Sequence, residues 1–102
     1  PNLTAIYATG EPQMVASVAA VQSQGRQDSV KVYGWDLTKS VIDGIDAGYV
    51  AGVVQQDPAG MGKAAVEALD KLTAGETVEA VISVPATIVT KENVDQFRDM
   101  FK

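Results

Sequence analysis

Apolar residues along the chain alternate between short runs typical of strands and spacings typical of helices. The runs at residues 3–8 and 30–35 are apolar and rich in β-branched or aromatic residues, and each is followed by turn-forming residues. Between them, apolar residues recur at helical spacing from Pro12 until Gly25, which is placed to end the helix. The first third of the chain therefore predicts a strand, a helix and a second strand.

The same alternation continues through the middle of the chain. Thr38 is placed to cap a helix that Gly48 closes, and residues 49–55 form a third apolar run. Asp57 as N-cap and Pro58 at the first helical position then begin a clearly marked helix. Gly75 stands just past the end of that helix. Its expected apolar face consists of Met61, Ala65, Ala68, Leu69 and Leu72.

The C-terminal quarter predicts short strands and a last helix. Residues 80–84 and 86–90 form two short strands or one bent edge strand, because Pro85 between them cannot donate to a central ladder. Thr90 is placed to cap the last helix. The apolar stripe of that helix consists of Val94, Phe97 and Phe101. Strands that alternate with helices predict an α/β fold, a parallel sheet of right-handed βαβ units covered by helices.

Composition and charge exclude several classes of function. The 102 residues carry 8 Lys and Arg against 13 Asp and Glu, which argues against nucleic-acid binding because phosphate contacts need clustered cations. Without Cys or His the chain has no thiolate nucleophile, zinc site of the usual ligands or Ser-His-Asp relay. No apolar run approaches the ~20 residues that span a bilayer, so we expect a soluble protein without membrane insertion. If the protein is exported, we expect its signal peptide to have been removed.

Polar residues follow the first three predicted strands, at the edge where ligands bind in open parallel sheets. These residues are Thr9, Gly10 and Glu11 after the first strand, Asp36 after the second, and Gln55, Gln56 and Asp57 after the third. A carboxylate that accepts from hydroxyls, beside an amide that donates and accepts, suits a neutral polyol or sugar. Because the set lacks groups for proton transfer near neutral pH, we expect a binding protein with no catalytic residue, metal or cofactor.

Most of these side chains also have a structural explanation. Helix capping explains Asp57, and we favour it. For Asp36, a structural role as a helix cap or turn former and a role in ligand binding are equally favoured. Gln55 and Gln56 point to opposite faces of a strand, so at most one faces the crevice. Trp35 can stack on a sugar ring. A lone Trp in an apolar strand is more often a core residue, however, so we favour a core position.

Five segments, in their order and spacing, carry a family resemblance. They are residues 1–8 (PNLTAIYA), 32–36 (VYGWD), 45–58 (IDAGYVAGVVQQDP), 61–66 (MGKAAV) and 89–94 (VTKENV). Together they resemble the periplasmic sugar-binding proteins of the ribose-binding type. The resemblance implies a type I periplasmic binding protein-like fold and a bacterial, periplasmic, two-lobed protein that is not an enzyme. Such a protein closes on a sugar and delivers it to an ABC transporter permease.

The resemblance also implies roles for individual residues. Asp36 corresponds to the carboxylate that accepts sugar hydroxyls, and Gln56 to the amide at the hinge end of the third strand. The usual Asn after the first strand aligns with Gly10, between Thr9 and Glu11. This departure changes which hydroxyl can be held, so the resemblance does not imply ribose itself.

The resemblance covers only the C-terminal part of a two-lobed protein, because two lobes need more than twice this length. Residues 1–56 are then expected to form part of the C-terminal lobe, and residues 57–102 to cross to and complete the other lobe. Alternatively, residues 1–102 form one α/β domain through swapping or rearrangement. An incomplete lobe exposes apolar faces and a strand edge, so we expect this fragment to form a homo-oligomer or swapped dimer.

An effector-sensing domain of a LacI-type transcription regulator is the alternative function, since it shares the fold and much of the first two motifs. The pattern at residues 46–52 and the ending at residues 90–93 favour transport. A signal peptide upstream of the chain would support transport, and a helix-turn-helix segment would support regulation.

Overall fold

The structure, a computed structural model, describes all 102 residues and divides them into two units. The first unit contains Pro1–Gln55 and Ile88–Lys102, and the second contains Gln56–Thr87. Residues 88–102 thus group with the first unit, because Val89 and Val94 are buried in its core. This grouping differs from the predicted division, which places all of residues 57–102 in the second part. The assignment of these parts to lobes of a larger protein stays a prediction.

A four-stranded sheet forms the centre of the first unit, with the strands in the order β1-β2-β3-β4. The strands are β1 (Ala5–Tyr7), β2 (Lys31–Trp35), β3 (Val50–Gln55) and β4 (Thr87–Val89). β2 pairs in parallel with both β1 and β3, which confirms the predicted βαβ units. The register of β2 and β3 shifts by one residue, because Val32 pairs with Val50 whereas Tyr33 pairs with Gly52.

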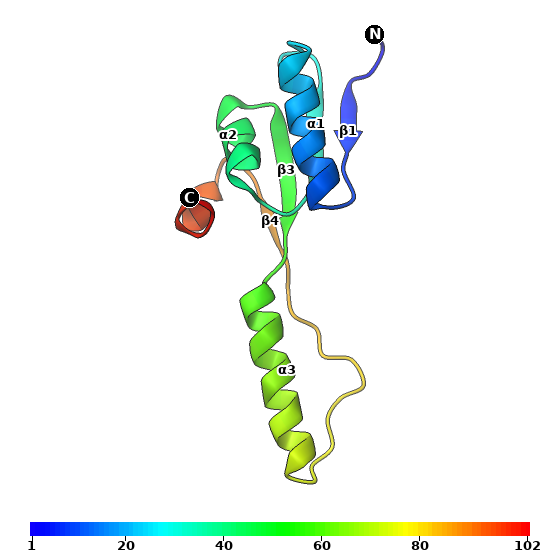
Figure 1. Cartoon of the computed structure of the whole chain (residues 1–102), viewed down its shortest axis with the longest axis vertical. Helices are drawn as coiled ribbons and strands as arrows, with labels where there is room; N and C mark the ends of the chain where they lie inside the picture. Colours follow the sequence, from blue (N-terminus) through cyan, green and yellow to red (C-terminus); the bar gives the residue numbers. More distant parts are fainter. The chain divides into compact units, whose positions relative to one another are not determined.

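Helices α1 (Glu11–Ser23) and α2 (Lys39–Ala47) pack against each other and against the sheet (Figure 1). The core between them contains Met14, Val18 and Val21 from α1, Val41, Ile42 and Ile45 from α2, and Val32, Val50 and Val53 from the strands. Gly34 allows α1 to approach β2 closely, since a Cβ there would lie 2.7 Å from the Sδ of Met14. The opposite face of the sheet presents Tyr7 and Tyr33, which are paired in register and exposed by 61% and 43%.

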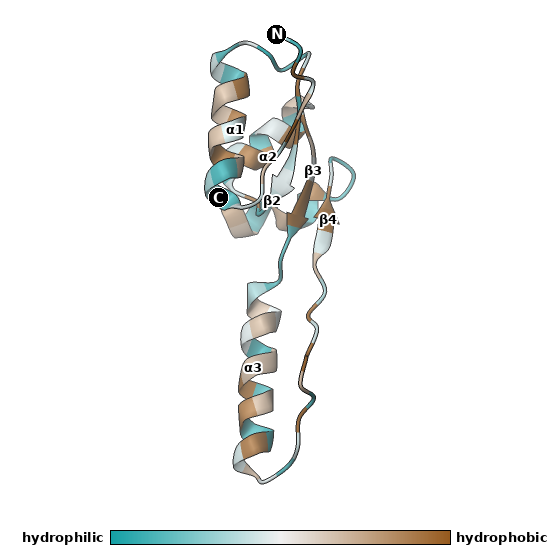
Figure 2. Ribbon diagram, turned by 90° about the vertical axis from the view of Figure 1, so that its right-hand side faces the viewer, coloured by the Kyte–Doolittle hydropathy of each residue, from teal (hydrophilic) through white to brown (hydrophobic).

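The second unit contains one helix, α3 (Pro58–Thr73), and the extended segment after it. The helix begins as predicted, because the Asp57 carboxylate accepts from the Gly60 amide at 2.9 Å. It ends before Gly75, which has a φ of 80°. None of its 16 residues is buried. Figure 2 shows the hydrophobic residues along α3, of which Val66 and Leu69 are exposed by 61% and 60%.

The C-terminal elements differ in part from the prediction. Residues 80–84 form no strand, because a strand needs a neighbour to pair with and the second unit contains no other strand. The last helix is a 3-10 helix, η1 (Val94–Phe101), and Asn93 rather than Thr90 precedes it. The Thr90 hydroxyl instead accepts from the Glu92 amide in the turn before η1. The predicted stripe is confirmed, since Val94, Phe97 and Phe101 all pack on the core. No helix of the chain is both long enough and apolar enough to cross a membrane.

Candidate ligand-binding site

The residues predicted after the first two strands lie at one edge of the first unit. Thr9 and Gly10 connect β1 to α1, Glu11 is the first residue of α1, and Asp36 directly follows β2. Because β1 and β2 are parallel and Tyr7 pairs with Tyr33, the chain leaves both strands at the same edge. Thr9 and Glu11 are exposed there, and Asp36 is half-buried.

Asp36 has an unusual backbone conformation. Its φ of 69° makes it the one residue other than glycine with a positive φ, and its amide donates to the Val54 carbonyl at 2.9 Å. The left-handed region costs energy for residues with a side chain, although Asp tolerates it better than most. Asp36 does not cap α2, because Thr38 does so by accepting from the Val41 amide at 3.3 Å. The capping explanation for Asp36 is therefore wrong, and a strained residue at a strand end is typical of functional sites.

The two glutamines after β3 differ in their surroundings. Gln55 is only 6% exposed, and its side-chain oxygen accepts from the Leu37 amide at 2.8 Å. Gln56 is half-buried and is the first residue of the second unit. Since the Gln55 side chain is engaged in the interior of the first unit, Gln56 stays the predicted ligand-binding amide. The hydrogen bond of Gln55 to the turn after Asp36 is a contact that the sequence pattern did not reveal.

Trp35 does not lie in the core, so the sequence-based preference for a core position is wrong. It is half-buried and lies on the face of the sheet opposite α1 and α2. Its indole Nε1 donates to the Tyr7 hydroxyl at 2.6 Å. The two aromatic rings therefore form a hydrogen-bonded pair at the ends of β1 and β2, where Trp35 directly precedes Asp36 and Tyr7 lies two residues before Thr9. Such amphipathic rings beside a carboxylate can contact both the apolar and the hydroxyl parts of a sugar.

The clearest ion pairs of the first unit lie away from these strand ends. Arg98 of η1 binds Asp46 at the end of α2 through two contacts of 2.7 and 2.9 Å, and it also binds Asp95 at 2.6 Å. The hydrogen bonds from Arg98 lower the pKa of the Asp46 carboxyl below its ordinary value. These contacts attach η1 to α2, so the role of Arg98 and Asp46 is structural. No group of three or more Asp or Glu side chains lies close enough together to hold a metal ion.

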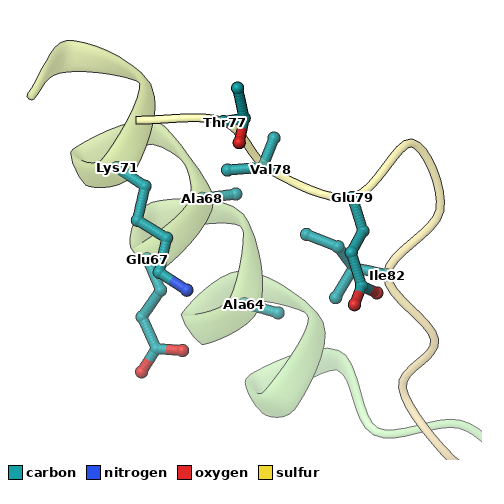
Figure 3. A pocket seen from close by; sticks show the side chains of 8 residues that line it. All are labelled: Ala64, Glu67, Ala68, Lys71, Thr77, Val78, Glu79 and Ile82. Atoms are coloured by element: carbon teal, nitrogen blue, oxygen red, sulfur yellow. The ribbon is translucent and has the colours of Figure 1, made fainter. Parts of the chain in front are cut away.

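The second unit contains a cavity, which is the other place where a ligand site could be sought. It has a volume of about 410 Å³ and lies between α3 and the extended segment after it (Figure 3). Ala64, Glu67, Ala68 and Lys71 line it from α3, and Thr77, Val78, Glu79 and Ile82 line it from the segment. None of the residues predicted to bind a ligand lies there. We therefore favour the strand ends of the first unit.

The sequence of the chain is similar to those of known binding proteins. Residues 1–77 match a family model described as "Periplasmic binding protein domain". A putative rhizopine-binding protein from Rhizobium meliloti is 35% identical over 95 residues, which cover 92% of this chain and 31% of that protein. The ribose import binding protein RbsB from Escherichia coli (strain K12) is 30% identical over 92 residues, which cover 90% of this chain and 31% of that protein.

A solved structure matches the whole chain. It is the crystal structure of a carbohydrate transporter solute binding protein from Agrobacterium radiobacter in complex with D-arabinose. The two are 27% identical, with a TM-score of 0.86 over 100% of this chain and 35% of that one. The chain spans about a third of the length of the curated relatives that it matches.

Proposed function

Because the chain belongs to the periplasmic binding protein domain family, we propose that it is the C-terminal part of a sugar-binding protein for ABC-type import. The full-length protein binds a sugar in the periplasm, closes its two lobes on it and delivers it to a transporter permease, without catalysis. The observation that carries the proposal is Asp36, a half-buried carboxylate held at φ 69° at the end of a central parallel strand.

Asp36 supports the proposal because its backbone favours a different residue. Glycine adopts a φ of 69° without the strain that a side chain causes. A carboxylate at this position, at the edge of the sheet where ligands bind, supports a role in ligand binding. An ionised carboxylate accepts hydrogen bonds from two neighbouring hydroxyls, which is how a protein distinguishes a sugar from water and from apolar solutes.

The other residues complete a binding site for a neutral sugar. Thr9 contributes a hydroxyl, Gln56 an amide, and the Trp35 ring an apolar surface, and Glu11 adds a second acceptor at the same edge as Asp36. Gly10 contributes no side chain to this site, and the side-chain oxygen of Gln13 lies beside it. The ligands named for the relatives support a sugar or polyol as the ligand class.

Calorimetric titration of the full-length protein that contains this chain tests the proposal. Pentoses and hexoses are titrated into the wild type and into Asp36→Asn, which keeps the shape of the side chain and tolerates the left-handed backbone. Asp36→Ala is less suitable, because it adds backbone strain to the loss of the carboxylate. The matched control is Asp28→Asn, an exposed carboxylate in the turn before β2.

We expect Asp36→Asn to bind the preferred sugar about 10- to 100-fold more weakly, since hydrogen bonds to a charged group contribute about 1.5–3 kcal/mol. Asp28→Asn is expected to bind like the wild type. Unchanged affinity in Asp36→Asn would overturn the role of Asp36. Absence of binding to every sugar, together with a helix-turn-helix segment encoded upstream, would replace the proposal with the regulator alternative.

A further inference from the structure

We propose that Gln55 is a positioning residue for the sugar site, because its buried amide holds the turn that presents Asp36. The inference rests on the proposed function and adds a residue that the family resemblance does not assign. Gln55 is the last residue of β3, and Asp36 begins the turn between β2 and α2. The two residues therefore lie at the carboxyl ends of the neighbouring strands β2 and β3, Asp36 just after its strand and Gln55 as the last residue of its own.

Two hydrogen bonds attach this turn to the end of β3. The Asp36 amide donates to the carbonyl of Val54 at 2.9 Å, and the Leu37 amide donates to the Gln55 side-chain oxygen at 2.8 Å. Leu37 itself is 2% exposed, so its side chain fixes the far end of the turn in the core. The backbone on both sides of the Asp36 side chain is thus held by β3.

The conformation of Asp36 makes this attachment necessary. A φ of 69° lies in a region that a free Asp seldom occupies, so the turn persists only where surrounding contacts over-determine it. Without the Gln55 oxygen, the Leu37 amide becomes a buried donor with no acceptor. The turn then relaxes to restore that hydrogen bond with water, and the Asp36 carboxylate moves with it.

The burial of Gln55 also favours this role. It is the one polar side chain among the buried residues of the chain, and its neighbours on the same face are the core residues Val53 and Val50. An apolar residue would fill this place in the core without the cost of burying an amide. The hydrogen bond to Leu37 accounts for the choice of a polar residue, since buried polar groups are retained where they are bonded.

Amide hydrogen exchange on the 102-residue chain tests the structural part of the inference. Gln55→Met keeps the length of the side chain and removes the acceptor, whereas Gln55→Glu keeps an acceptor oxygen. We expect Leu37 to exchange about tenfold faster or more in Gln55→Met, and to remain protected in Gln55→Glu. The matched control is Val50→Ala, a core substitution at the other end of β3, which is expected to affect global stability without a specific effect on Leu37.

Titration of the full-length protein tests the consequence for binding. Gln55→Met is expected to weaken sugar binding about tenfold, and Val50→Ala to leave it unchanged. The double variant Asp36→Asn with Gln55→Met is expected to bind no more weakly than Asp36→Asn alone, because Gln55 acts through Asp36. Additive losses in the double variant would show a merely structural role and would overturn the inference.

The outcomes separate the inference from the proposed function. If the wild type binds a sugar and Gln55→Met binds it equally well, the inference is wrong and the proposed function stands. If the wild type binds no sugar, the proposed function is wrong, whatever the exchange of Leu37. If Gln55→Met does not fold, Gln55→Asn replaces it, since the shorter amide does not reach Leu37. An unchanged exchange rate at Leu37 in Gln55→Asn would also contradict the inference.

Discussion

The helices of the two units are stabilised in different ways. Helix α1 has no side-chain cap, because Gly10 stands at its N-cap, but it buries Met14, Val18 and Val21. Helix α3 has a capping carboxylate at Asp57, yet it buries no residue; both helices have a proline in the first turn. Tertiary packing holds α1 in place, whereas local sequence signals define α3. Strong helix signals and a fixed place in a core are therefore separate properties.

The largest expected effect is a difference in how much a truncated side chain destabilises the protein, depending on whether it comes from α1 or from α3. Met14→Ala removes a fully buried side chain from the first unit and is expected to lower the free energy of unfolding by about 2–5 kcal/mol. Leu69→Ala removes a side chain that is 60% exposed on α3 and is expected to change it by at most about 0.5 kcal/mol. Urea denaturation followed by the fluorescence of Trp35, the single tryptophan, measures both. Equal losses in the two variants would contradict the comparison.

The second effect concerns self-association of the 102-residue chain. We expect the wild type to form dimers or larger species as its concentration rises, because Val66, Leu69 and Leu72 of α3 are each more than half exposed. Substituting Val66→Lys together with Leu69→Lys is expected to shift the distribution toward the monomer. Sedimentation velocity over a hundredfold range of concentration measures this shift. A wild type that stays monomeric throughout would show that the exposed apolar side chains of α3 do not drive association.

The smallest effect concerns the ion pair that attaches η1 to α2 within the first unit. Hydrogen bonds from Arg98 lower the pKa of Asp46 in the folded state. Ionised Asp46 therefore contributes stability above the pKa of the unfolded chain, which is about 4, and this contribution is lost as the pH falls through the lower folded pKa. The expected Tm of the wild type slightly exceeds that of Asp46→Asn at pH 6, and the difference narrows toward pH 3.

Thermal unfolding at several pH values, at low and at high salt, measures this difference. High salt is expected to narrow it, since the side chains of Arg98 and Asp46 are both about 40% exposed. A Tm difference that is independent of pH would show that Arg98 attaches η1 by packing rather than by charge.

Local signals predicted most of the elements correctly. Thr38 and Asp57 cap their helices through side-chain oxygens, as expected, and Gly48 and Gly75 end them with positive φ. Each of these signals acts within about four residues, so no knowledge of the rest of the chain is needed. The family resemblance is confirmed by the match of residues 1–77 and by the likeness to a solved solute-binding protein over the whole chain.

The candidate site was predicted only in outline. The order of strands and helices was sufficient to bring the residues after β1 and β2 to one edge, because parallel strands end on the same side of a sheet. The positive φ of Asp36 and the bond from Leu37 to Gln55 were not predictable, since both depend on how neighbouring strands pair. A polar residue on the buried face of a strand is the signal that points to Gln55.

Local sequence signals are sufficient to place most helix ends and to identify the residues that follow each strand. These features depend on capping oxygens, prolines, glycines and the period of apolar residues, all of which act locally. The tertiary structure alone decided that Trp35 lies outside the core, that residues 80–84 form no strand and that α3 buries nothing. Burial and strand pairing need partners that are distant in the chain, so no local pattern contains them.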